Sequence, residues 1–221
     1  HSQNFYGLQN PIIDPIILEN LDPKQQLKYL SIQSHWQWFD TVLKDADLTA
    51  HLTTDSFETN ELELVLNAKF QVSIGSIAIN AEPSLRYLNN KFASDYYTTE
   101  ATEFASGVSQ MALSASSGAN RFKFKIGATG AYGFGDDFEE AKLYVLPLLD
   151  LSYKPKKGNF TPFLKVSGAL NQNSFRAFTN RNPYTAPAIV LKNTEVPYTA
   201  ELGLRTKIVS GWEFAINGHY Q

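Results

Sequence analysis

Three features of the sequence predict an all-β fold, built as an antiparallel β-barrel that spans a membrane. Apolar and polar residues alternate over runs as long as the roughly 9 to 11 residues of a membrane-crossing strand. Short and long connections between these runs follow one another in turn. No run reaches the roughly 18 consecutive apolar residues of a membrane-spanning helix. About eight or nine strands are visible, so the chain is one barrel or part of a larger one.

The composition argues against several other classes of protein. The formal net charge is −3 and the pI is about 5.8, and lysines and arginines are dispersed, so no nucleic-acid partner is expected. The absence of cysteine excludes disulfides, thiolate metal sites and cysteine nucleophiles. The mean hydropathy of −0.26 is compatible with a membrane barrel, because only alternate residues of each strand face lipid.

The first 45 residues are predicted to be an extended or helical segment, periplasmic or docked on a partner, ahead of barrel strands in residues 46–221. Asp22 and Pro23 are suited to cap and begin a short helix. Residues 34–45 suit either a helix or a strand, and hold Trp36 and Trp38. These rings are either buried in a core or seam, or part of an aromatic belt at a membrane surface.

The alternation is clearest from Glu61 to Ile74. Every second residue is apolar, and the residues between are polar or charged except Val65. Gly75-Ser76 predicts a two-residue hairpin into a second strand that ends near Tyr87. The first apolar stripe comprises Leu62, Leu64, Leu66, Ala68, Phe70, Val72 and Ile74. It is long enough to cover the roughly 25 Å apolar band of a membrane barrel.

Further strands follow along the chain. After a loop at residues 89–103 and a weaker strand at 104–115, three strand-length runs cover 121–132, 141–153 and 160–172. The last two runs cover 198–208 and 212–220, joined by a tight turn at Ser210-Gly211. The apolar faces predicted for the three central runs are Phe122, Phe124, Ile126, Ala128 and Tyr132; Leu143, Val145, Leu149, Leu151 and Tyr153; and Leu164, Val166 and Leu170.

The order of the connections indicates the bacterial outer membrane. Barrels of Gram-negative bacteria have short periplasmic turns at one rim and long external loops at the other. A soluble sandwich with Greek-key connections has no reason to alternate in this way. Residues 173–195 form the longest connection and are the best candidate for an external loop that contacts a ligand or partner. The candidate contact residues in this loop are Phe175, Arg176, Phe178 and Tyr184.

The polar faces of the strands are predicted to line the lumen. They carry both signs of charge, as expected of a wall that faces water, a plug or a cross-strand partner. The candidate lumen residues are Glu82, Arg86, Lys123, Lys125, Glu201 and Arg205. In the alternative, a soluble lipocalin-like barrel, the inner face is apolar and these charges are solvated.

No motif predicts catalysis, a cofactor or a metal. The glycines Gly127, Gly130, Gly133 and Gly135 lack the Lys-Ser or Lys-Thr of a phosphate loop, and are better explained by strand packing. The acidic residues from Asp136 to Glu140 lack EF-hand spacing. The histidines form no HExxH motif. We therefore expect a non-enzymatic protein.

The last hundred or so residues resemble a known family. The strings Gly158-Asn-Phe-Thr-Pro-Phe-Leu-Lys, Asn173-Ser-Phe-Arg-Ala-Phe-Thr-Asn-Arg-Asn-Pro-Tyr and residues 191–221 are similar to barrel strands of Bacteroidota-type outer-membrane proteins, the TonB-dependent-receptor-like group. The resemblance implies energy-coupled uptake of a large or scarce ligand, a plug inside the barrel and TonB as partner. The sequence shows no recognisable TonB box or plug domain, so the chain is also interpreted as a piece of a longer protein.

These observations predict a barrel that contacts outer-membrane lipid and serves porin-like transport of a solute or ligand. Other outer-membrane or periplasmic proteins are candidate partners. The first alternative is a structural or accessory subunit of a larger envelope complex. The second is a soluble β-barrel that binds an apolar ligand.

Overall fold

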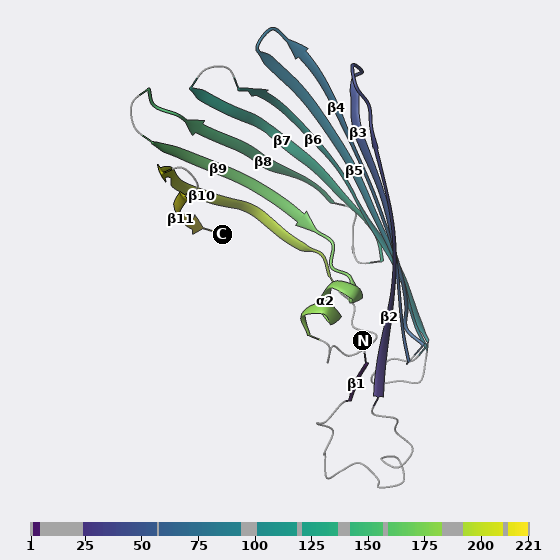
Figure 1. The fold of residues 1–221 in the computed structure, drawn as a ribbon. Coiled ribbons are helices and arrows are strands. Elements are labelled where there is room, and N and C mark those ends of the chain that lie inside the picture. Colours follow the sequence, from purple (N-terminus) through teal and green to yellow (C-terminus); the bar gives the residue numbers. More distant parts are fainter. Residues whose placement is uncertain are drawn as a thin grey trace.

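In the part of the chain that the structure describes, the strands form one long antiparallel sheet, and one short helix accompanies it (Figure 1). The computed structural model describes residues 2–4, 24–56, 58–93, 101–118, 121–136, 142–156, 159–182, 192–209 and 212–220. Eleven strands lie side by side in the order in which they occur in the sequence. The prediction of an all-β, antiparallel chain is confirmed. Among the described strands neither β1 nor β2 pairs with β11, so the sheet is open.

The strands are longer than those of ordinary soluble sheets, which average five or six residues. From β2 to β10 each has between 12 and 16 residues. The strands are β1 (Ser2–Asn4), β2 (Lys24–Gln37), β3 (Leu43–Asp55), β4 (Asn60–Ile74), β5 (Ile77–Phe92), β6 (Thr102–Ser117), β7 (Phe122–Gly135), β8 (Lys142–Tyr153), β9 (Phe160–Asn171), β10 (Thr194–Val209) and β11 (Trp212–Tyr220), and the helix is α2 (Phe175–Arg181).

The hairpin predicted at Gly75-Ser76 is present. Ile74 pairs with Ile77, and Gly75 has φ +60°, as expected for glycine at the first central position of a type II′ turn. The turn predicted at Ser210-Gly211 lies outside the described residues, although Val209 pairs with Trp212 on either side of it.

The described start of the chain is largely extended, which is one of the two forms predicted for the first 45 residues, and Asp22 and Pro23 lie outside the described residues. Residues 24–37 form strand β2, not a short helix, and β2 pairs with β3 from Leu27 to Gln37. Partner strands supply hydrogen bonds along β2, and they outweigh a weak local helix signal. The sheet therefore extends across the boundary placed at residue 45. Trp36 and Trp38 are 44% and 38% exposed, so their burial in a core is not observed.

Two predicted connections also contain regular structure. Within residues 89–103, β5 continues to Phe92 and β6 begins at Thr102. Within residues 173–195, α2 forms after the N-cap Ser174, whose hydroxyl accepts a hydrogen bond from the Ala177 N–H. Both connections are therefore shorter, as loops, than the sequence indicated.

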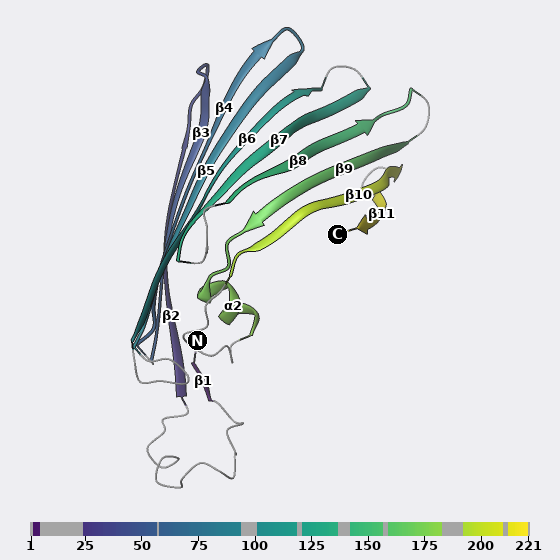
Figure 2. The same ribbon diagram turned by 180° about the vertical axis from the view of Figure 1, so that it is seen from behind.

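The two faces of the sheet differ in chemistry. We call the face that carries α2 the inner face and the opposite face the outer face (Figures 1 and 2). Residues alternate between the faces along each strand. On β4, Glu61 and Glu63 point inward and are buried, whereas Leu62, Leu64 and Leu66 point outward and are 37% to 47% exposed. The stripe predicted for Glu61 to Ile74 thus lies on the outer face.

The predicted face of Leu170 is wrong. Leu170 is 3% exposed and packs with Val108, Ala131 and Leu146 on the inner face. Described pairing between β8 and β9 ends at Leu148 and Ser167, and the register of β10 against β9 shifts between Val196 and Thr199. An irregularity of this kind changes which face the following residues point to.

Close packing of β6 against β7 requires glycine at position 127, as the sequence suggested. A Cβ on Gly127 would lie 2.0 Å from the Leu113 carbonyl oxygen and 2.7 Å from the Ser114 Cα. Both atoms belong to backbone and cannot swing aside. A Cβ on Gly130, three residues further along β7, would meet nothing within 4 Å.

We therefore expect Gly127→Ala to lower the free energy of unfolding by about 1–3 kcal/mol, as overpacking does. Gly130→Ala is the matched control and should change it by no more than about 0.5 kcal/mol. Denaturant titration of both variants measures the difference. Equal effects of the two substitutions would contradict the close packing at Gly127.

Candidate functional site

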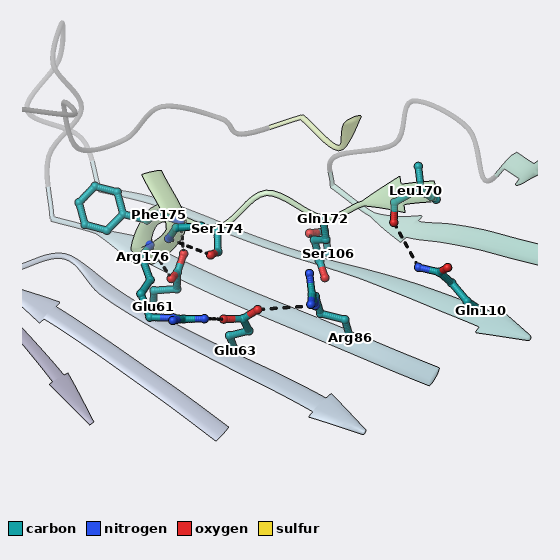
Figure 3. Close-up of polar contacts among 11 residues, drawn as sticks. Glu61, Glu63, Arg86, Ser106, Gln110, Leu170, Gln172, Ser174, Phe175 and Arg176 are labelled. Carbon is teal, nitrogen blue, oxygen red and sulfur yellow. Dashed lines mark hydrogen bonds and ion pairs between the residues drawn. The ribbon is translucent and has the colours of Figure 1, made fainter. Parts of the chain in front are cut away.

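The chain leaves β9 and crosses the inner face of the sheet, where it forms α2 (Figure 1). We call Leu170–Arg181 the inner segment. Two amide side chains hold its first part to β6. The Gln110 Nε2 donates to the Leu170 carbonyl at 3.2 Å, and the Gln172 Nε2 donates to the Ser106 hydroxyl at 2.9 Å (Figure 3). These contacts fix the path of the segment before the helix begins.

Two glutamates of β4 hold the start of α2. The Glu61 carboxylate accepts hydrogen bonds from the backbone N–H groups of Phe175 and Arg176, at 2.5 and 2.9 Å (Figure 3). The Arg176 guanidinium donates to Glu63 at 2.7 Å, and the Arg86 guanidinium lies 3.6 Å from the same carboxylate. Because the first N–H groups of a helix have no partner inside it, a buried carboxylate in this position stabilises the helix.

An apolar contact completes the attachment of α2. The Phe175 ring is 1% exposed and packs with Leu27, Phe92 and Phe104. Its centroid lies 5.8 Å from that of Phe92 in an edge-to-face arrangement, the geometry that aromatic pairs prefer. Polar and apolar contacts together make α2 a fixed part of the inner face near one rim of the sheet.

All six predicted lumen residues belong to the inner face by strand register. The structure does not gather them into one cluster. Lys125 lies 3.1 Å from Glu82, and Arg86 joins the Glu63 network. On the far strands, Glu201 lies 3.8 Å from Lys165, and Arg205 stacks 4.6 Å from the centre of the Phe163 ring. Lys123 is exposed on the same face.

The predicted external-loop residues are placed differently. Phe175 is buried and Arg176 is bound to Glu63, so neither is available at an external surface. Phe178 packs against the same apolar cluster. Tyr184 lies outside the described residues. The sequence did not single out Glu61 and Glu63 as the partners of this segment, although two carboxylates on one strand face are a signal of a buried polar contact.

The inner face also has two hollows between the side chains. One, of about 110 Å³, lies between β4, β5, β6 and the inner segment, beside Arg86 and Gln110. A wider one, of about 390 Å³, lies among polar side chains that include Asn67, Lys69 and Glu82. The smaller hollow is lined chiefly by polar groups, whereas the wider one also has apolar lining residues such as Pro83 and Ala112.

The remaining candidate features are possible metal ligands, a histidine–aspartate pair, the acidic loop and membrane-spanning helices. In the described ranges, no group of three or more histidine or acidic side chains could hold a metal ion. His35 and Asp47 form a hydrogen-bonded pair of 2.6 Å between β2 and β3. Asp136, from the acidic loop, accepts a hydrogen bond from the Ala105 N–H. No helix among the described residues has both the length and the apolar character needed to span a membrane.

Comparison with known proteins gives no relative. The chain matches no protein family, no curated protein and no solved structure. The proposed function therefore rests on the chemistry of the two faces of the sheet and on the contacts of α2.

Proposed function

We propose that the sheet is the wall of an outer-membrane β-barrel that passes polar solutes, without catalysis, and that α2 narrows its lumen. The observation that carries this proposal is the sidedness of the sheet. In the middle of the strands the outer face is apolar and exposed, whereas charged side chains point to the inner face. Lipid outside and water inside is the arrangement that makes this pattern stable.

The exposed apolar surface extends across the whole sheet. Its residues come from strands along the whole sheet, and the representative ones named below are 42% to 75% exposed. Soluble monomers rarely expose contiguous apolar patches of more than a few hundred Å². Representative members are Leu48, Leu66, Leu113, Ile126, Val145, Leu202 and Ile216. Lipid is the partner that such a surface favours, and the sidedness is opposite to that of a soluble barrel with an apolar interior.

Aromatic side chains on the outer face lie toward the strand ends. On β7, Phe122 and Tyr132 are 50% and 43% exposed. At about 3.4 Å per residue and the usual tilt, the ten positions between them span about 25 Å across a membrane. Exposed aromatics near the ends of other strands are Trp36, Tyr153, Phe160, Tyr198 and Tyr220. Two such girdles border the apolar band of membrane barrels, so these rings support the predicted aromatic belt.

A structural role is the second candidate, and α2 favours it. A helix fixed to the inner face by buried hydrogen bonds reduces the space for solutes near its rim. A barrel that accompanies a larger envelope complex has no need of an open lumen. Stoichiometric copurification with other subunits, without conductance in a planar bilayer, would favour that role over transport.

The first test is whether the protein folds in lipid. We expect the purified protein to remain soluble only with detergent or lipid, and to migrate on a gel at different positions before and after heating. In planar bilayers it should then carry an ion current. A protein that is monodisperse without detergent and has no heat-dependent migration would contradict the proposal.

The inner charges should set ion selectivity. We expect Lys123→Glu combined with Lys125→Glu to raise the permeability of cations over anions several-fold, because both lysines lie on the proposed lumen wall. Reversal potentials in a salt gradient measure the ratio. Lys91→Glu, on the outer face beside Glu103, is the control and should leave the ratio unchanged. Equal ratios in all variants would place the conducting path elsewhere.

A further inference from the structure

A row of three polar side chains lies on the inner face beneath α2. Thr53, Glu61 and Asn90 are direct cross-strand neighbours on β3, β4 and β5. They are 0%, 1% and 0% exposed, respectively. We call this row, together with Glu63, the polar seat.

The inner segment satisfies only part of the polar seat. Both oxygens of Glu61 bind backbone N–H groups of α2. By contrast, the Thr53 hydroxyl and both polar atoms of the Asn90 amide have no hydrogen-bond partner in the structure. The Arg176 Nε is also buried without a partner. A buried polar group without a partner costs free energy, so α2 fits its own seat incompletely.

The contacts of α2 show which chemistry the seat accepts. An aromatic ring enters the apolar cluster beside it, which is formed by Leu27, Phe92 and Phe104. Two consecutive backbone N–H groups bind Glu61, and the guanidinium of the second residue binds Glu63. Figure 3 shows these groups converging from one short stretch of chain. The seat thus recognises a peptide backbone, an aromatic side chain and a guanidinium together.

We propose that the polar seat is a binding site for a peptide that carries an aromatic residue followed by arginine, and that Phe175-Arg176 is its internal occupant. A peptide from outside that offers amide and carbonyl groups to Thr53 and Asn90 would make contacts that α2 does not make, and would compete with α2 for the seat. This inference deepens the proposed transport function by naming a solute class. The contacts that define the seat hold whether or not the sheet spans a membrane.

The test uses the full chain in detergent and the peptide N-acetyl-Phe-Arg-amide, with binding measured by titration calorimetry. The double variant Phe175→Ala/Arg176→Ala removes the ring from the apolar cluster and the guanidinium from Glu63, and leaves α2 only its two backbone hydrogen bonds to Glu61. We expect it to bind the peptide at least 10-fold more tightly than the unaltered protein. Adding Glu61→Gln to the double variant should weaken binding at least 10-fold, because the glutamine amide offers one acceptor oxygen in place of two.

Two controls decide the outcome. N-acetyl-Phe-Gln-amide has no guanidinium and should bind at least 10-fold more weakly to the double variant. The milder double variant Phe175→Leu/Arg176→Ala keeps a smaller apolar side chain at position 175, and it repeats the test if the alanine double variant loses its strand structure. Absence of binding to a folded double variant, or equal binding of the two peptides, would overturn the proposal.

The experiments distinguish an incorrect peptide-binding proposal from an incorrect membrane-barrel proposal. Peptide binding that depends on Glu61, in a protein that needs no lipid to fold, would retain the seat and remove the transport function. Heat-modifiable migration and ion current without peptide binding would retain the barrel and remove the seat.

Discussion

Leu66→Arg is expected to destabilise the protein folded into lipid by about 2–4 kcal/mol. This is the cost of an arginine near the midplane of a membrane barrel. Leu66 lies midway along β4, points to the outer face and is 47% exposed. In a soluble protein a charge at so exposed a position would cost little. Denaturant titration of the protein folded into lipid vesicles measures the loss.

The adjacent residue supplies the control. Asn67 is on the same strand but belongs to the inner face, where it borders both hollows. Asn67→Arg places the same charge one position along, facing the lumen, and should change stability by less than about 1 kcal/mol. Equal tolerance of arginine at 66 and 67 would remove the assignment of the outer face to lipid.

Glu61→Gln is expected to release α2 from the inner face. The carboxylate accepts two backbone hydrogen bonds in a buried position, and each hydrogen bond to a charged group contributes about 1.5–3 kcal/mol. The amide offers one oxygen, and its NH₂ group faces the second N–H. We expect the attachment of α2 to weaken by about 3 kcal/mol, which corresponds to roughly 100-fold faster amide exchange at Phe175 and Arg176.

Mass-spectrometric hydrogen exchange of a fragment that contains residues 174–182 measures this change. Glu82→Gln is the matched control, since among the described residues Glu82 pairs only with Lys125, and the two side chains are 35% and 32% exposed. Such a pair contributes at most about 1 kcal/mol. Unchanged protection of α2 in Glu61→Gln would show that Phe175 packing alone holds the helix.

Alternation was sufficient to predict most of the sheet, because a strand whose two faces meet different surroundings must repeat its pattern every two residues. The apolar stripe of β4 follows directly from the alternation, and the hairpin follows from the Gly75-Ser76 pair that interrupts it. Position 170 could not be predicted, since a register irregularity reverses the faces without a signal in the pattern. The short helix expected after Pro23 is not formed by residues 24–37, because pairing of β2 with β3 outweighs the local helix signal.

The inner segment could be predicted only as a long connection. The hydrogen bond between Glu61 and the Phe175 N–H joins residues 114 positions apart, and no local pattern specifies such a contact. Ser174 was available as an N-cap, yet the seven residues of α2 are too few to give a helical period. The candidate lumen residues could be predicted because alternation alone gives the strand face on which each residue lies. Strand register places them on the inner face.

The central claim is that the outer face meets lipid and the inner face meets water. Spin labels placed one at a time from Glu61 to Ile74, in the protein folded into vesicles, test it directly by their collision rates with oxygen, which concentrates in lipid, and with a water-soluble nickel complex. The account predicts a period of two, with oxygen favoured at Leu62, Leu64, Leu66 and Val72, and nickel favoured at the accessible residues between them. Nickel access at the leucines equal to that at Asn67 and Gln71 would contradict it.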